Sequence, residues 1–264
     1  MSESAVLLEV DARGVAAVTL NRPDRHNAFD DAMIGELTTI FTALAARGDV
    51  RAMVLGARGA SFSAGADLAW MQRMAAYGRE ENLRDANLLA DMLAALWALP
   101  VATIASVQGS AFGGGVGLVS CCDIAIGATD ARFALSEVRL GLAPATIGPY
   151  VIDAIGPRAA RRYFQSAERF SAARAAELGL LSEVVAAAEL EETVASVVDA
   201  VVAGGPDAVR AAKRLVADLA GQPITADLRA DTSVRIADLR ASDEGREGLA
   251  AFLEKRRPAW RPGD

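Results

Sequence analysis

Two segments of small residues stand where the chain is expected to pass from a strand into a helix. The first is SFSAGADL (61–68), and the second is VQGSAFGGGVGL (107–118). Backbone N–H groups in the first turn of a helix have no partner in that helix, and small side chains let a ligand approach them. One N–H group from each segment can converge on a single oxygen atom and form an oxyanion hole. The alternative for each segment is a tight turn that needs small residues for packing alone.

Other common catalytic motifs are absent from the sequence. It contains neither a GxxxxGK[ST] phosphate loop nor a GxSxG nucleophile elbow, and its glycine cluster (109–117) does not match the GxGxxG register. The single histidine, His26, lies in a polar stretch that is typical of a surface loop. Cys121 and Cys122 are adjacent, so disulfide geometry between them is unfavourable, and we expect two buried thiols. No metal site is predicted.

Composition and charge exclude several classes of protein. The chain has 264 residues, of which 52% are hydrophobic, and a net charge of −7, which argues against non-specific nucleic-acid binding. Two clusters of arginines, 158–162 and 256–257, are interpreted as solvated helix faces. We find neither an apolar stretch of membrane-spanning length nor a signal-peptide pattern, so we expect a cytoplasmic protein without a membrane partner.

Strands alternate with helices in the first half of the chain, and helices dominate the second half. Apolar runs at 5–10 and 15–20 predict a hairpin, and Ile34, Leu37, Phe41 and Leu44 predict a helix over 30–46. Alternation of strands with helices implies parallel βαβ units. Further strands are expected at 51–57, 101–107, 123–128 and 131–135. Further helices are expected at 67–77, 79–99, 157–166, 171–178, 188–203, 206–220, 224–241 and 243–256.

Five motifs in order resemble the enoyl-CoA hydratase/isomerase (crotonase) superfamily. They are LNRPDRHNAF (20–29), AGADL (64–68), QGSAFGGGVGL (108–118) with Asp123 downstream, FALSEVRLGL (133–142) and FLEKRRPAW (252–260). The resemblance spans nearly the whole chain. It implies an α/β fold, a crotonase-like stack of ββα units over residues 1–195, and a helical C-terminal region over 196–264 involved in trimerisation. The implied assembly is a homotrimer or homohexamer.

The resemblance also assigns roles to individual residues. The backbone N–H groups of Ala66 and Gly114 would hold the thioester carbonyl oxygen as negative charge develops on it. The resemblance places four further residues at the CoA: Ala64, Asp67, Leu68 and Lys255, the last often acting on a neighbouring subunit. Asp67 has an alternative role as the N-cap of the following helix. No separate cofactor is expected, since coenzyme A is part of the substrate.

Two positions determine what chemistry the resemblance implies. Hydratases of this family commonly use two glutamates, and the second of them is present as Glu137, whereas the first position is occupied by Gly117. One carboxylate can take a proton from attacking water and return it to the α-carbon, or it can move a proton between two carbons in an isomerase. The alternative for Glu137 is an ordinary ion pair at a strand end.

A finer resemblance concerns the substrate. FGGGVGLVSCCD, SEVRLGLAPATI, AERF and AFLEKRRPAW are similar to a subgroup of bacterial hydratases that acts on 3-methylglutaconyl-CoA in leucine breakdown or on related carboxylated isoprenoid-CoA compounds. We therefore predict a hydratase for a β-branched enoyl-CoA, with a single-glutamate isomerase and a non-catalytic acyl-CoA-binding protein as alternatives. Gly117 is expected to free space beside the β-carbon. Arg73, Arg79 and Arg84 are candidates to pair with a distal carboxylate.

Overall fold

A six-stranded sheet forms the centre of the molecule. The computed structural model describes residues 4–261, and the strand order in this sheet is β1-β2-β3-β5-β7-β10. The expected hairpin is confirmed, because β1 and β2 pair antiparallel, and every other neighbouring pair in the sheet is parallel. The strands are β1 (Val6–Val10), β2 (Val15–Leu20), β3 (Ala52–Ala57), β5 (Ala102–Val107), β7 (Ile124–Ala128) and β10 (Glu183–Val185).

A second, smaller sheet lies at the ends of the parallel strands. Its order is β4-β6-β8-β9, with the first three strands parallel and the last antiparallel. Each of β4, β6 and β8 follows a long strand of the first sheet and precedes a helix, which is the stack of ββα units that the sequence resemblance implied. The strands are β4 (Ser61–Ser63), β6 (Ser110–Phe112), β8 (Arg132–Ala134) and β9 (Phe170–Ser171). Sequence patterns predicted β8 but not the other three.

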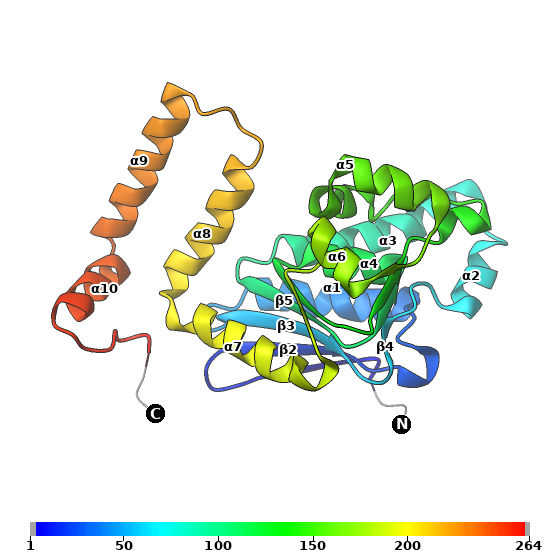
Figure 1. Cartoon of the computed structure of the whole chain (residues 1–264), viewed down its shortest axis with the longest axis horizontal. Coiled ribbons are helices and arrows are strands. Elements are labelled where there is room, and N and C mark those ends of the chain that lie inside the picture. The colour runs from blue at the N-terminus through cyan, green and yellow to red at the C-terminus, as the bar shows by residue number, and fades with distance from the viewer. Residues whose placement is uncertain (1–3, 262–264) are drawn as a thin grey trace.

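Helices α1 and α3 cover one face of the larger sheet, and α7 covers the other (Figure 1). Helix α1 (Asp31–Ala45) confirms the helix that the amphipathic pattern predicted. It begins after Asp30, whose side chain accepts a hydrogen bond from the Met33 N–H. Side chains alternate between the two faces along each strand, so Met53 packs in the cluster beneath α1 and α3 (Arg79–Trp97), whereas Ala52 packs in the cluster beneath α7.

Helix α4 (Gly114–Cys121) is buried on all sides, which its uniformly small and apolar sequence allows. Helix α5 (Gly148–Ser166) begins nine residues before the expected start at 157. The difference has a physical reason: Gly156 adopts φ 74°, outside the helical region, and Pro157 follows it. That break makes the second half of α5 resemble a separate helix in sequence.

The C-terminal helices divide between the core and an arm. Helix α7 (Leu190–Ala203) buries Leu190, Val194 and Val198 against the sheet, so it belongs to the core. The expected boundary between residues 195 and 196 therefore falls inside a helix, and the arm begins at Pro206. The remaining helices are α2 (Leu68–Met74), α6 (Ala172–Leu178), α8 (Pro206–Leu219), α9 (Ala226–Ala241) and α10 (Asp243–Leu253).

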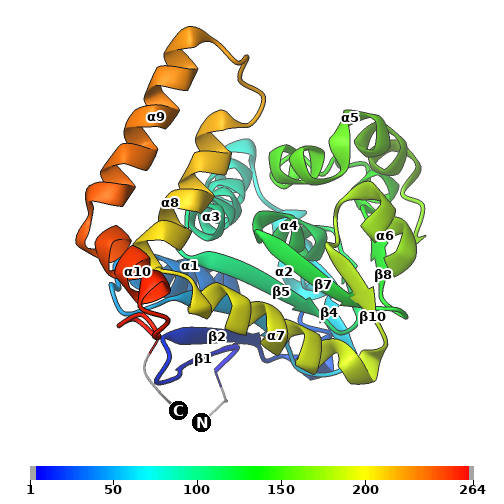
Figure 2. The ribbon, with the colours of Figure 1, turned by 60° about the vertical axis from the view of Figure 1, so that its left-hand side comes forward.

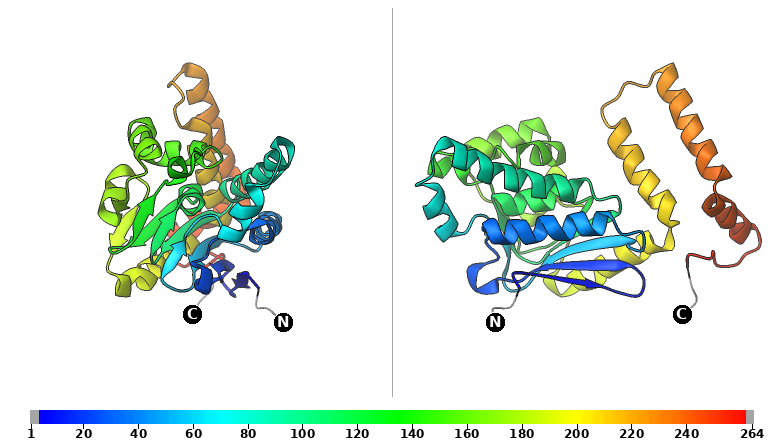
Figure 3. Two further views of the ribbon diagram at one scale, coloured as in Figure 1. Left: turned by 90° about the vertical axis from the view of Figure 1, so that its right-hand side faces the viewer. Right: turned by 180° about the vertical axis from the view of Figure 1, so that it is seen from behind.

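The arm projects away from the sheets. Helices α8 and α9 form an antiparallel pair, with α10 returning toward β1 and β2 (Figures 2 and 3). Helix α8 contacts the core, because Lys213 pairs with Asp123 at 2.7 Å and Arg210 donates to Val50 O at 3.1 Å. Neither α8 nor α9 has a buried residue, and α10 has only Ala251. Within residues 4–261, no helix has the length and hydropathy to cross a membrane.

Candidate active site

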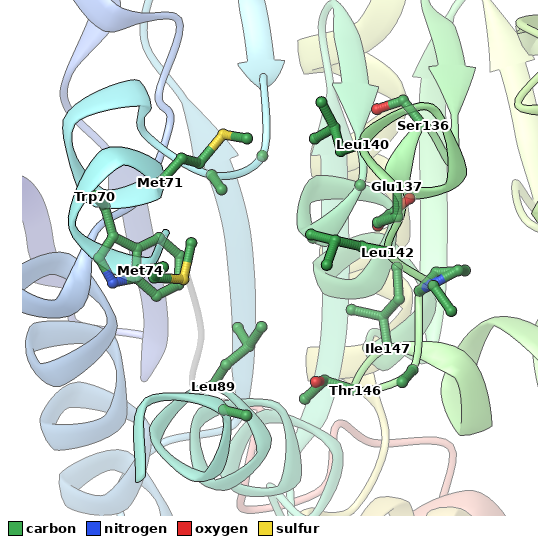
Figure 4. Close-up of a pocket in the computed structure, with 18 of the residues that line it drawn as sticks. Trp70, Met71, Met74, Leu89, Ser136, Glu137, Leu140, Leu142, Thr146 and Ile147 are labelled. Atoms are coloured by element: carbon green, nitrogen blue, oxygen red, sulfur yellow. The ribbon is translucent and has the colours of Figure 1, made fainter. Parts of the chain in front are cut away.

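A cavity of about 380 Å³ opens where the two small-residue segments meet. Its walls come from residues 64–66 and 113–114, from helices α2 and α3, and from the loop 136–147. Figure 4 shows Glu137, Leu142 and Ile147 on one wall, with Trp70, Met71 and Met74 on the wall opposite. The lining is mostly apolar with a few polar groups, as is typical of a small-molecule site.

Ala66 and Gly114 both line this cavity, and their backbone N–H groups are unpaired. The Phe29 N–H donates to Gly65 O at 2.8 Å and the Asp67 N–H donates to Phe29 O at 3.0 Å, which holds the peptides on both sides of Ala66. Gly114 is the first residue of α4, so its N–H has no partner in the helix. Neither N–H finds an acceptor within residues 4–261. The two donors therefore remain available to a bound oxygen.

The glycines bring these two segments into direct contact. A Cβ atom on Gly65, where φ is +87°, would lie 2.8 Å from Phe112 O and 3.7 Å from Gly114 N. A Cβ atom on Gly114 would lie 2.2 Å from the Phe29 ring. The same small residues thus allow the tight packing and leave the N–H groups of Ala66 and Gly114 unobstructed, so the two interpretations of these segments are compatible.

Glu137 enters the cavity from the segment after β8, at the first residue of a 3-10 helix (Glu137–Leu140). A Cβ atom on Gly113 would lie 3.2 Å from Glu137 Oε1, so the carboxylate sits beside the turn that presents Gly114. Glu137 Oε2 is buried without a hydrogen-bond partner. Burial raises the pKa of Glu137 above its ordinary value, although its own backbone N–H works in the other direction.

The ion pair considered for Glu137 is not formed by any residue within 4–261. A buried polar atom without a partner requires an explanation, such as a catalytic role or an unseen ligand. Glu137 is therefore placed to exchange a proton with a molecule in the cavity.

Gly117 does not behave as expected, because it lies behind the cavity wall and does not line it. A Cβ atom at this position would lie 2.4 Å from Ile147 Cγ2 and 2.9 Å from Ile147 Cβ. The expectation that glycine frees volume beside the β-carbon is wrong, because Ile147 fills that volume. Ile147 itself lines the cavity, so an apolar side chain stands where a second carboxylate would otherwise reach.

Asp67 is fully engaged in the protein. Its Oδ1 accepts hydrogen bonds from the N–H groups of Ala69 and Trp70. Its Oδ2 forms ion pairs with Arg22 at 3.1 Å and Arg25 at 3.0 Å. Burial opposes ionisation, but the hydrogen bonds from Arg25 and the backbone hold the pKa of Asp67 below its ordinary value. This geometry matches the N-cap alternative.

The other residues that the resemblance placed at the CoA differ in position. Ala64 lines the cavity. The side chain of Leu68 is 77% exposed and lies outside the lining. Lys255 follows α10 at the end of the arm and also lies outside the lining, so a role at the CoA would require a neighbouring chain.

The opposite wall contains residues that sequence patterns did not single out. Trp70 is 4% exposed, and its Nε1–H donates to Asp85 Oδ1 at 3.2 Å. Leu89, on the helix expected over 79–99, also lines the cavity. The arginines that were candidates to pair with a distal carboxylate do not line the cavity. Arg73 pairs with Asp31 at 2.6 Å. Arg79 and Arg84 lie outside it as well.

Residues 4–261 contain no group of three or more side chains that could hold a metal ion.

Comparisons with known proteins agree with this geometry. The family model for enoyl-CoA hydratase/isomerase matches residues 11–263. An enoyl-CoA hydratase structure from Shewanella pealeana is 43% identical with a TM-score of 0.93, covering 97% of this chain and 96% of that one. Another from Mycobacterium smegmatis is 37% identical with a TM-score of 0.91, covering 98% and 99%. A Thermus thermophilus protein whose name gives enoyl-CoA hydratase as its inferred activity is 32% identical over 254 residues, which cover 96% of this chain and 100% of that protein. The chain belongs to the enoyl-CoA hydratase/isomerase family.

Proposed function

We propose that the protein is a hydratase, a lyase that adds water across the α,β double bond of an enoyl-CoA. One observation carries the proposal. The unpartnered carboxylate of Glu137 shares a cavity with the two unpaired N–H groups of Ala66 and Gly114. A proton carrier and a pair of oxyanion donors are what addition of water to a thioester-conjugated double bond requires.

The proposed reaction uses Glu137 twice. A water oxygen bonds to the β-carbon while Glu137 takes one of its protons. The π-electron pair moves toward the thioester carbonyl, and the resulting enolate oxygen is held by the N–H groups of Ala66 and Gly114. Glu137 then returns the proton to the α-carbon, which forms the new C–H bond and regenerates the carboxylate. Burial of Glu137 favours this exchange, because a raised pKa brings its proton affinity closer to the working pH.

For the acyl group, we propose a methyl branch on the β-carbon, the feature that 3-methylglutaconyl-CoA and its relatives have and crotonyl-CoA lacks. Two observations support the branch: the sequence resemblance to that subgroup, and the apolar wall that Ile147 presents in place of a second carboxylate. A methyl group against Ile147 buries apolar surface, whereas a second water or acid there would be left unpaired.

An isomerase is the second candidate, because one carboxylate is sufficient for it. In that reaction Glu137 removes a proton from one carbon of the enolate system and returns it to another, so no water is consumed. The third hypothesis is an acyl-CoA-binding protein without activity. It does not explain why Glu137 Oε2 is buried without a hydrogen-bond partner.

The test is a turnover assay in isotopically labelled water, with crotonyl-CoA and 3-methylcrotonyl-CoA as substrates and mass spectrometry as the readout. A hydratase incorporates one labelled oxygen, and we expect faster turnover of the branched compound. A product of unchanged mass with a shifted double bond would establish the isomerase instead. Binding of CoA thioesters without turnover of any kind would establish the binding protein.

Glu137→Gln is the matched substitution, because it keeps the size of the side chain and removes the proton carrier. We expect turnover to fall by roughly 10²–10⁴-fold, since general acid–base catalysis typically contributes that much. Binding of free CoA, measured by calorimetry, should be unchanged. Glu183→Gln, at an exposed position on β10, is the control and should retain full activity. Near-normal turnover in Glu137→Gln would remove Glu137 from the mechanism.

A further inference from the structure

The wall opposite Glu137 carries a second carboxylate that the proposed reaction does not use. Asp85, on α3, lines the cavity and is half-buried. Its Oδ1 accepts a hydrogen bond from the indole N–H of Trp70 at 3.2 Å, and Trp70 is only 4% exposed. Asp85 Oδ2 has no hydrogen bond or ion pair with any residue within 4–261. Asp85 therefore brings to the cavity lining a carboxylate with one oxygen held by Trp70 and the other without a partner among the described residues.

The neighbouring polar group on this wall is a neutral amide. Asn82 lies one turn before Asp85 on α3 and lines the same cavity. Its amide Nδ2 donates one hydrogen to Tyr77 O at 3.2 Å, which leaves the amide oxygen and the second N–H without a partner among residues 4–261. The indole donor of Trp70 is already used by Asp85. The wall thus offers a negative charge from Asp85 beside a neutral amide from Asn82.

No positive charge balances this wall. Among residues 4–261, no arginine, lysine or histidine side chain lines the cavity. Arg73, the basic residue on α2, is paired with Asp31 outside the lining at 2.6 Å. An acyl group with a terminal carboxylate would therefore meet like charge without a compensating cation, which is a strong means of rejecting one substrate against another.

The wall is placed to contact the end of the acyl chain. Figure 4 shows Trp70 and Met74 across the cavity from Glu137, and Asp85 is bonded to Trp70. If the reacting carbons lie beside Glu137, an acyl tail that crosses the cavity meets the wall formed by α2 and α3.

We propose that Asp85, held by Trp70, makes the protein select enoyl-CoA substrates whose acyl tail is uncharged and reject those that carry a terminal carboxylate. This inference rests on the proposed function. It keeps the β-methyl branch but replaces the carboxylated tail of 3-methylglutaconyl-CoA by an apolar or hydroxyl-bearing tail.

Binding of two unreactive thioesters tests the inference apart from turnover. Isovaleryl-CoA and 3-methylglutaryl-CoA share the methyl branch and differ by one carboxylate, and neither has a double bond to hydrate. We expect wild-type protein to bind isovaleryl-CoA at least about tenfold more tightly by calorimetry, since about 1.4 kcal/mol corresponds to each factor of ten. Equal affinity, or tighter binding of 3-methylglutaryl-CoA, would overturn the inference.

Asp85→Asn assigns the selection to one side chain. We expect the variant to bind 3-methylglutaryl-CoA about tenfold more tightly than wild type while its affinity for isovaleryl-CoA stays within about twofold. Asp91→Asn removes the same charge from an exposed position on the same helix and should leave both affinities unchanged. Equal changes for both ligands in Asp85→Asn would show a structural role only. Because neither ligand is turned over, these results stand whether or not the labelled-water assay supports the hydratase.

Discussion

Glu137 is the residue at which function and stability oppose each other most clearly. Its Oε2 is buried without a partner, and burial raises its pKa. A group whose folded-state pKa is raised destabilises the folded protein when it is charged, and proteins commonly retain such groups only where activity needs them. The energetic cost of Glu137 should therefore be measurable by removing its charge.

We predict that Glu137→Gln is more stable than wild type at neutral pH. Below the ordinary pKa of 4.5, the carboxyl is protonated in both folded and unfolded states, so the two proteins should melt alike. As the pH rises through the raised folded-state pKa, wild type alone loses stability. Tm measured by calorimetry between about pH 4 and pH 8 should show a difference that grows to a few degrees or so.

The control for this measurement is Glu183→Gln, whose carboxyl is exposed on β10. Its Tm should follow wild type at every pH. A Tm difference for Glu137→Gln that is constant from acid to neutral pH would contradict the prediction, because it would mean that packing and not charge distinguishes the two side chains.

The sequence allowed prediction of some site residues but not others, for physical reasons. The two small-residue segments could be predicted because unpaired N–H groups depend on local chain geometry, which small residues reveal. The choice of Ala66, Gly114 and Glu137 as individual residues came only through family resemblance. Ile147 could not be predicted, because it reaches Gly117 across a contact between two helices that no local pattern records. Asp85 could not be predicted as a site residue for the same reason, since its hydrogen-bond partner Trp70 lies on a different helix.

At the scale of elements, the short strands position the site. β4 and β6 each span three residues and pair with each other, and each lies inside one of the two small-residue segments. Neither strand could be predicted, because three residues within a run of serine, alanine and glycine show no strand periodicity, whereas β8 lies in the more apolar run 131–135. The long strands and amphipathic helices were predicted because their patterns repeat over several turns or pleats.

The contact between α4 and the residue before α5 explains why position 117 is glycine. We predict that Gly117→Ala destabilises the protein by about 1–3 kcal/mol, the usual cost of overpacking, because the new Cβ would meet Ile147 Cγ2 at 2.4 Å. Gly35→Ala is the matched control, since it makes the same change inside α1 where a Cβ meets nothing within 4 Å. It should gain about 0.5–1 kcal/mol from helix propensity. Urea unfolding of each variant measures both values.

A second substitution identifies the colliding group. Ile147→Ala removes the Cγ2 atom, so the double variant with Gly117→Ala should lose less stability than the sum of the two single changes. Strict additivity would show that some other contact makes Gly117 necessary. The same contact also limits any attempt to restore a glutamate at position 117, because the longer side chain could enter only if Ile147 moved.

The whole molecule leaves a large apolar surface uncovered on its arm. Helices α8 to α10 bury almost nothing within the chain. On α10, Leu249 is 55% exposed, Phe252 is 80% exposed and Leu253 is 77% exposed. Soluble proteins rarely leave several large apolar side chains together in water, and such a surface commonly marks an interface.

We therefore expect three copies, or two sets of three, to assemble through this arm and to bring Lys255 near a neighbouring cavity. Light scattering at micromolar concentration should give a mass three or six times that of one chain. Replacing Phe252 and Leu253 together by Asp should shift the mass toward the single chain, because charge at a buried interface is costly. Ile152→Asp, at a 41% exposed position on α5 away from the arm, should leave the mass unchanged. If wild-type protein is a stable monomer at that concentration, the arm does not assemble the molecule, and Lys255 has no neighbouring site to reach.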